Sequence, residues 1–197
     1  KISFSSNLML IDLNFDKYLS ELVEFLRYKS ISTNPTYSKD VKACASYLAK
    51  HLRSIGFKNA EVLDTKGHPI CYASYEVNPT YPTVLFYGHY DVQPPEPLEL
   101  WQSPPFEPTI KDGQIIARGA SDDKGQVFCH IKALETLLKE TGTLPLNVKL
   151  LIEGEEEVGS PSLENFLIEN KEKLKCDAVV ISDTPMYAKD VPSICTS

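Results

Sequence analysis

The sequence lacks the cysteine spacing of a disulfide-stabilised domain or of a thiolate zinc site. Its five cysteines are an odd number, and no two of them form a Cys-x-x-Cys pair. We therefore expect reduced thiols, most of them buried as small apolar side chains.

Long apolar runs are also absent. No stretch reaches the roughly 18 consecutive apolar residues that a membrane-spanning helix requires, so no membrane partner is expected. The short apolar run at residues 8–11 has neither a basic flank nor a small-residue cleavage site, and it does not predict a signal peptide. Together these absences predict a cytoplasmic protein.

The chain has no excess of basic residues. It carries 20 Lys and Arg against 27 Asp and Glu, which gives a formal net charge of −7. Binding to nucleic acid requires a basic face, so no nucleic-acid partner is expected. Four glutamates fall within residues 153–157, and this local concentration of carboxylates favours a cation as ligand.

Helical and extended patterns alternate along the 197 residues, which are enough for one domain with its own core. Helical periodicity predicts helices at 14–30, 40–55, 124–139 and 162–170, the first with Asn14 as N-cap and Phe15 on its apolar face. Apolar runs predict strands at 61–63, 69–75, 83–87, 146–152 and 178–181. The last two runs do not alternate with polar residues, which is typical of strands buried on both faces of a parallel sheet. The predicted fold is therefore α/β, with a largely parallel sheet flanked by helices.

Metal-competent side chains follow three of the predicted strands. His89 and Asp91 come after the strand at 83–87, and residues two apart on an extended chain point the same way. An imidazole beside a carboxylate suits metal binding, because the acid fixes the tautomer and leaves the other ring nitrogen free. On its own, such a pair could equally form an ordinary hydrogen bond in a loop.

The other two strands end in carboxylates. Glu156 and Glu157 follow the strand at 146–152, Asp183 follows the last strand, and Asp122 stands at a predicted helix start. Ligands of open α/β sheets bind outside the carboxyl ends of the strands, so we expect these groups along one edge. Two simpler interpretations remain: the glutamates form a solvated loop, and Asp122 is a helix cap.

Four sequence motifs resemble those of the di-zinc exopeptidase family, nearest its dipeptidase branch. They are Gly88-His89-Tyr90-Asp91-Val92-Gln93-Pro94, the run from Gly119 to Gly125, the run from Glu153 to Ser160, and Ile181-Ser182-Asp183. The resemblance extends from about residue 15 to residue 183. It implies that residues 14–197 are the N-terminal part of a phosphorylase/hydrolase-like catalytic metallopeptidase domain.

The resemblance also implies roles for individual side chains. The metal ligands it implies are His89, Asp122, Glu157 and Asp183, with Asp122 bridging two ions and joined to Asp123 by a cis peptide bond. Asp91 would orient His89, and Glu156 would be the general base. Nitrogen and oxygen donors without thiolate independently suit Zn²⁺, with Mn²⁺ or Co²⁺ as substitutes. The expected cofactor is two Zn²⁺ per full-length subunit.

The function implied by this likeness is hydrolysis of a peptide bond in a dipeptide by a metal-bridging water. The alternative within the family is an amidohydrolase acting on N-acyl amino acids, as a deacylase or desuccinylase. A metal-dependent phosphoryl hydrolase is disfavoured, because the sequence has no phosphate-binding glycine-rich loop. A different kind of alternative is that this chain is a catalytically inactive fragment.

Members of this family continue with an inserted lid domain used for dimerisation, and then with a final histidine ligand. This sequence has neither before Ser197, and none of His51, His68 and His130 lies in a matching motif. We expect these three histidines to be structural. We therefore also expect the second metal site to be incomplete here, and a homodimer to form through a lid outside this chain.

Overall fold

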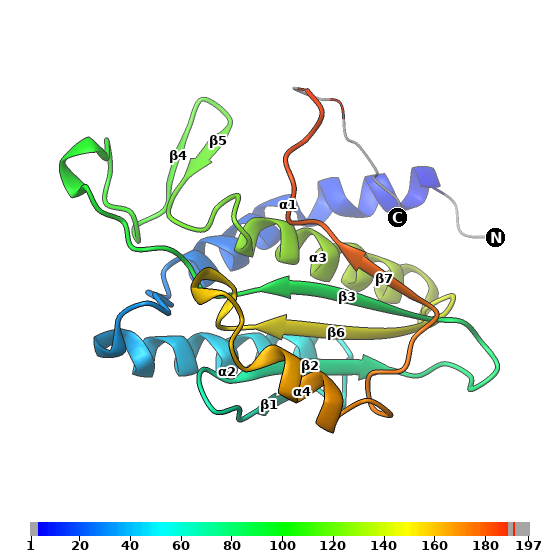
Figure 1. The fold of residues 1–197 in the computed structure, drawn as a ribbon. Helices are drawn as coiled ribbons and strands as arrows, with labels where there is room; N and C mark the ends of the chain where they lie inside the picture. Colours follow the sequence, from blue (N-terminus) through cyan, green and yellow to red (C-terminus); the bar gives the residue numbers. More distant parts are fainter. Residues whose placement is uncertain (1–3, 189–190, 192–197) are drawn as a thin grey trace.

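A five-stranded sheet with helices on both faces forms the body of the computed structural model, which describes residues 4–188 and 191 (Figure 1). The helices are α1 (Phe4–Leu26), α2 (Ser38–Ser54), α3 (Lys124–Thr141) and α4 (Leu163–Glu169), with short 3₁₀ turns η1 (Pro35–Tyr37), η2 (Leu98–Leu100) and η3 (Glu156–Val158). The strands of this sheet are β1 (Glu61–Leu63), β2 (Ile70–Tyr75), β3 (Thr83–His89), β6 (Asn147–Glu153) and β7 (Ala178–Ile181). A separate hairpin pairs β4 (Thr109–Lys111) with β5 (Gln114–Ile116).

The strand order in the sheet is β1-β2-β6-β3-β7. β3 pairs in parallel with both β6 and β7, whereas β2 is antiparallel to its two neighbours. Only β2 therefore opposes the direction of the other strands, and the expected largely parallel α/β sheet is confirmed. β1 and β2, which the sequence predicts as strands, pair with each other in antiparallel orientation.

Two apolar layers hold the helices against the sheet. Successive residues of a strand face opposite sides, so Leu150 and Ile152 of β6 lie in the layer under α1, α2 and α3, whereas Leu151 packs with Phe166 of α4. Three helices cover one face and α4 covers the other (Figure 1). This packing leaves the carboxyl ends of β3, β6 and β7 together at one edge.

The first helix differs from its prediction. α1 begins at Phe4, so Asn14 lies inside it and its side-chain nitrogen donates to the carbonyl of Leu10 at 2.7 Å instead of capping. Phe15 is 57% exposed, because the face that packs on α3 carries Tyr18, Phe25 and Leu26. The helical pattern continues upstream through residues 8–11, which were interpreted only as an isolated apolar run.

The last strand is also more exposed than predicted. β7 lies at the edge of the sheet, and Val179 and Ile181 are 55% and 58% exposed. Within residues 4–188 no further strand pairs with its outer edge. The expectation of burial on both faces is therefore wrong for the part of the chain that the structure describes.

The cysteines form no pair among the described residues. Cys44 and Cys71 are buried, Cys176 is half-buried and Cys129 is exposed, while Cys195 lies outside the described residues. Burial raises the pKa of the Cys71 thiol to about 12, as expected for an inert core thiol. Among the described helices, none combines the length and apolar character needed to cross a bilayer.

Candidate metal centre

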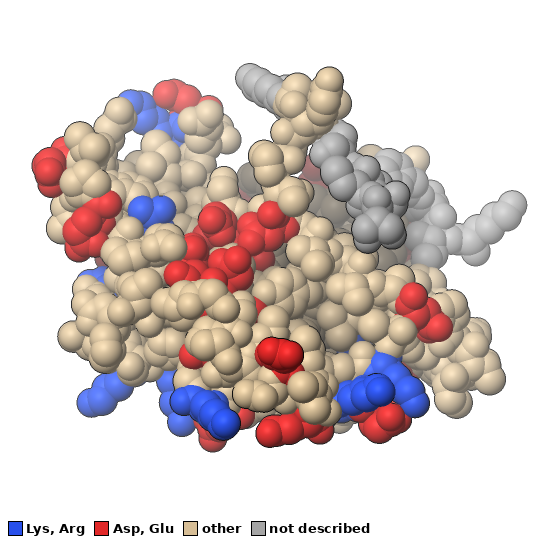
Figure 2. Space-filling view, viewed as in Figure 1, with Lys and Arg blue, Asp and Glu red and all other residues tan. Residues whose placement is uncertain are grey.

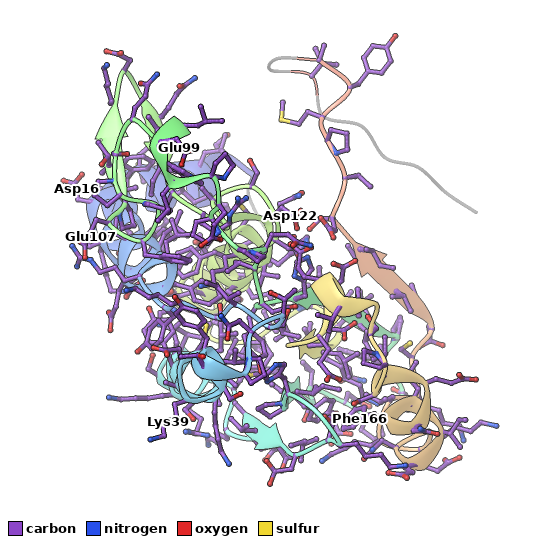
Figure 3. All side chains as sticks on the ribbon, turned by 60° about the vertical axis from the view of Figure 1, so that its left-hand side comes forward. Asp16, Lys39, Glu99, Glu107, Asp122 and Phe166 are labelled. Carbon is purple, nitrogen blue, oxygen red and sulfur yellow. The ribbon has the colours of Figure 1, made fainter. Side chains whose placement is uncertain are left out.

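The candidate ligands meet at the edge where the parallel strands end. His89 is the last residue of β3 and pairs in register with Glu153, the last residue of β6. Asp183 follows β7 by two residues, and the loop before α3 brings Asp122 beside it (Figure 3). Figure 2 shows the resulting concentration of carboxylates over the ends of β3 and β6.

Three of these side chains form the ligand triad, which consists of His89, Asp122 and Asp183. The imidazole Nε2 lies 3.0 Å from Asp122 Oδ1 and 3.3 Å from Asp183 Oδ2, and the three donor atoms are all within 4.8 Å of one another. Nε2 is fully buried, and despite these short distances it forms a hydrogen bond with neither carboxylate. A buried ring nitrogen without a partner, facing two carboxylate oxygens, fits a bound cation.

Asp91 holds the other side of the imidazole. His89 Nδ1 lies 3.1 Å from the backbone oxygen of Asp91 and 3.3 Å from its Oδ1. The Asp91 carboxylate is fully buried and accepts hydrogen bonds from Ser32 Oγ at 2.6 Å and from the backbone N–H groups of Glu156 and Glu157 at 3.2 and 3.1 Å. Burial would lower the pKa of His89, but Asp91 and the neighbouring acids outweigh it and raise this pKa to about 10.

The resemblance implies a hydrolase, and we expect Asp91→Asn in the full-length polypeptide to keep the metal ligands in place but to slow the implied reaction by about 10- to 100-fold, because His89 loses its anionic partner. Steady-state kinetics and metal analysis of the purified variant measure the two effects. Asp177→Asn is the matched control, since this exposed aspartate accepts a backbone hydrogen bond at the opposite end of β3. An unchanged rate in Asp91→Asn would remove Asp91 from the mechanism.

Asp123 makes a hydrogen bond to the backbone of a triad residue. It is buried, and its Oδ2 accepts the backbone N–H of His89 at 3.1 Å. Burial raises the pKa of Asp123 to about 7. The peptide bond between Asp122 and Asp123 is cis, and Asp123 at the N-cap position of α3 makes no side-chain capping bond. Asp123 and not Asp122 thus occupies the N-cap position, and the interpretation of Asp122 as a helix cap is not supported.

The two glutamates of η3 take different positions. Glu156 Oε2 lies 3.7 Å from His89 Nε2, next to the ligand triad. The Glu157 carboxylate accepts a hydrogen bond from Gln93 Nε2 at 2.7 Å and lies outside the triad. Glu157 and Asp122 line a common hollow of about 300 Å³. Asp122 therefore belongs to the triad and also lines the hollow that Glu157 lines.

A larger cavity opens on the other side of the triad. Its volume is about 770 Å³, and Asp122, Asp183 and Ser182 line it together with His130 of α3. His130 packs on the Phe86 ring, with 4.9 Å between centroids, and its Nε2 lies 2.7 Å from Ser182 Oγ. His68 Nε2 lies 3.1 Å from the Ser32 carbonyl. Both histidines make structural contacts, as expected.

Two buried side chains near the site make hydrogen bonds that the sequence pattern does not predict. Glu153 accepts hydrogen bonds from the Tyr87 hydroxyl and from Ser160 Oγ, the latter at 2.8 Å, so it joins β3 to the turn after η3. Lys124 is fully buried and donates to the carbonyls of Phe25 and Tyr28 at 3.2 and 2.7 Å. Lys124 thus fixes the end of α1 against the loop that carries Asp122.

A model of peptidase family M20/M25/M40 matches residues 85–195 of this sequence. The Beta-Ala-His dipeptidase of Mus musculus is 32% identical over 199 residues, an alignment that covers 93% of this chain and 40% of the relative. The Cys-Gly metallodipeptidase of Schizosaccharomyces pombe is 33% identical over 197 residues, with 93% of this chain and 41% of the relative covered.

A solved structure gives the same fold. The M20 family metallo-carboxypeptidase of Sulfolobus solfataricus superposes with a TM-score of 0.79 at 41% identity, covering 86% of this chain and 38% of that one. The chain thus spans about 40% of the length of the curated relatives named above.

Proposed function

This chain belongs to peptidase family M20/M25/M40, and from that premise we propose that it is the metal-binding part of a zinc-dependent exopeptidase that hydrolyses dipeptides. The observation that carries the proposal is the ligand triad, with its buried and unpartnered imidazole nitrogen between two carboxylates. A purely structural histidine would be expected to satisfy this nitrogen with a hydrogen bond.

The donor set fits divalent metal ions. The ligand triad would hold one ion, and Asp122 with Glu157 would hold a second, whose remaining ligand lies outside this chain. Imidazole and carboxylate donors without thiolate favour Zn²⁺, with Mn²⁺ or Co²⁺ as substitutes. When bound, such ions would supply Lewis acidity that lowers the pKa of water and polarises a carbonyl group.

Side chains of this chain would supply proton transfer and would position the metal ligands. Glu156, beside the triad, would accept the proton of the attacking water and deliver it to the leaving amine, which must be protonated to depart. Asp91 holds the His89 ring so that Nε2 faces the other ligands. Glu153 holds the turn after η3 against β3, and Lys124 holds the Asp122 loop against the end of α1.

The substrate class is proposed from the relatives and from the cavity. The names of the two curated relatives describe dipeptidases, one for Beta-Ala-His and one for Cys-Gly. The cavity of about 770 Å³ beside Asp122 and Asp183 is within the range of sites for small-molecule ligands. The proposal places the whole protein in the cytoplasm as a homodimer formed through a lid domain outside this chain.

The proposal is tested with the full-length polypeptide, stripped of metal and then titrated with Zn²⁺. We expect two bound ions per subunit and zinc-dependent hydrolysis of Beta-Ala-His or Cys-Gly. An N-acetyl amino acid should be hydrolysed far more slowly. Failure to bind zinc would contradict the proposed metal centre. Faster hydrolysis of the N-acetyl compound would show that the protein is an amidohydrolase and not a dipeptidase.

A further inference from the structure

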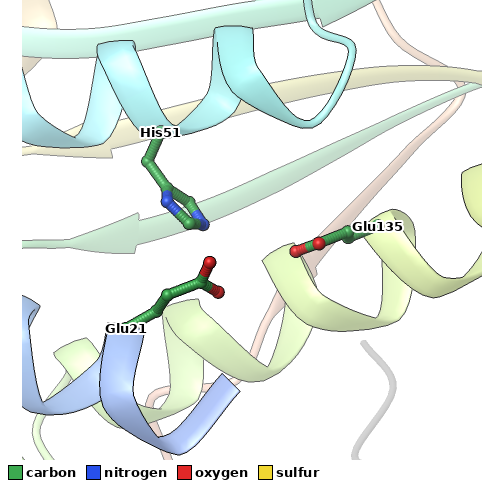
Figure 4. A group of neighbouring side chains, drawn as sticks. All are labelled: Glu21, His51 and Glu135. Carbon is green, nitrogen blue, oxygen red and sulfur yellow. The ribbon is translucent and has the colours of Figure 1, made fainter. Parts of the chain in front are cut away.

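A second group of potential metal ligands lies away from the ligand triad. Glu21 of α1, His51 of α2 and Glu135 of α3 point toward one another from three different helices (Figure 4). One donor atom from each lies within 4.8 Å of the other two, as is also true of the ligand triad. Two carboxylates and one imidazole are again the donors, so the chemistry alone would suggest a second metal site.

The position between these donors is already taken by an ammonium group. Lys132 Nζ lies 2.5 Å from Glu21 Oε2, 2.6 Å from Glu135 Oε2 and 2.8 Å from His51 Nε2. We call Glu21, His51, Lys132 and Glu135 the lysine cluster. Its imidazole nitrogen has a partner, whereas the corresponding nitrogen of the ligand triad has none.

Packing holds the ammonium in this position. Lys132 is only 7% exposed, and its Nζ lies 4.7 Å from the Phe128 ring centroid and 4.9 Å from that of Tyr18. These two rings add cation–π attraction to the three polar contacts. Departure of the lysine would leave two carboxylates of a largely buried cluster facing each other, so the bound arrangement is strongly favoured.

The protonation states match this assignment. Burial, and next the charge of Lys132, lower the pKa of His51 to about 4, so the imidazole is neutral and accepts from the ammonium. Burial would raise the pKa of Glu135, but hydrogen bonds from Lys132 and Lys139 outweigh it and lower this pKa to about 2. The other charged group facing the cluster, Lys17, contacts Glu21 at 2.5 Å and Glu135 at 3.2 Å.

We propose that the lysine cluster is a cation site occupied by the Lys132 ammonium, which excludes metal ions from it. Substitution of Lys132 by a shorter side chain opens the site to a divalent ion such as Zn²⁺ or Co²⁺. The site joins α1, α2 and α3 at one point. Since α3 begins directly after Asp122 and Asp123, the resident lysine also secures the helix on which the Asp122 loop depends. The proposal does not depend on the proposed reaction.

The first experiment compares Lys132→Ala with the unaltered full-length polypeptide by Co²⁺ titration, followed by calorimetry and visible absorption. We expect Lys132→Ala to bind one additional Co²⁺ and to gain thermal stability from it, because the vacated centre keeps three ligands. The double variant with His51→Gln should lose that ion again. Lys139→Ala is the matched control, since Lys139 also pairs with Glu135 but lies at the exposed edge of the cluster.

The second experiment does not require any change to Lys132. Metal analysis of His51→Gln should give the same number of ions per subunit as the unaltered protein. One ion fewer in His51→Gln would overturn the proposal, because the cluster would then hold a metal despite the lysine. A folded Lys132→Ala without an additional ion would overturn it equally. If Lys132→Ala does not fold, equal ion counts in the His51 comparison support the proposal.

Discussion

In the proposed two-metal centre, Asp122→Ala should weaken the binding of both ions more than any other single change in this chain. Substitution of residues that only contact a metal ligand costs about 10- to 100-fold in affinity, so loss of a ligand shared by two ions should exceed about 100-fold for each. Asp122 contributes an oxygen 3.0 Å from His89 Nε2 and also lines the hollow that carries Glu157, so both halves of the centre lose a donor. Calorimetric Zn²⁺ titration of the full-length polypeptide measures both affinities.

The control for this experiment is Asp64→Ala. Asp64 is exposed and its carboxylate pairs with Lys42 at 3.8 Å, so its loss should leave both zinc affinities unchanged. Asp122→Asn separates loss of charge from loss of the side chain, and it should retain the fold with weakened binding. Two intact zinc sites in Asp122→Ala would refute the bridging role and leave Asp122 as a loop residue.

Glu156→Gln should retain the metals and lose turnover. The amide has the shape of the carboxylate but cannot accept the proton, so the rate should fall by about 10²- to 10⁴-fold, the usual contribution of a general base. The hydrogen bond from Glu156 to Asp91 uses the backbone N–H and survives the change, so the ligand arrangement should be preserved. Stopped-flow or steady-state dipeptide hydrolysis with parallel zinc analysis is the measurement.

Glu164→Gln serves as the matched control, because this glutamate is exposed in the first turn of α4 and contacts none of the ligands. It should hydrolyse dipeptides at the normal rate. A near-normal rate in Glu156→Gln would exclude Glu156 as the base, and loss of zinc would show that it is a ligand instead.

The order of the elements and the meeting of the candidate ligands at one edge of the sheet were predictable from the sequence. Apolar runs followed at once by His89, Glu156 or Asp183 locate strand ends, and parallel strands bring such ends to one edge. The strand at 178–181 has the same bounds in the structure. These predictions succeeded because each depends on a local pattern together with one general rule of sheet topology.

Other features depend on contacts between distant helices and have no local pattern. Glu21, His51 and Lys132 lie on three helices, and helical spacing does not determine which faces meet. The only local signal was the i, i+3 pair of Lys132 and Glu135, which is also common on exposed helix faces. The sequence therefore predicted a structural role for His51, but not that its half-buried imidazole is the partner of an ammonium.

In the part of the chain that the structure describes, no strand pairs with the outer edge of β7, and this has a practical consequence. Unpaired backbone groups flanked by valine and isoleucine are a template for strands of other molecules, and natural sheets protect such edges with charge, proline or a covering segment. A preparation limited to these 197 residues would therefore tend to self-associate through intermolecular sheet formation. Concentration-dependent sedimentation would detect this association, and lysine substituted for Val179 should suppress it.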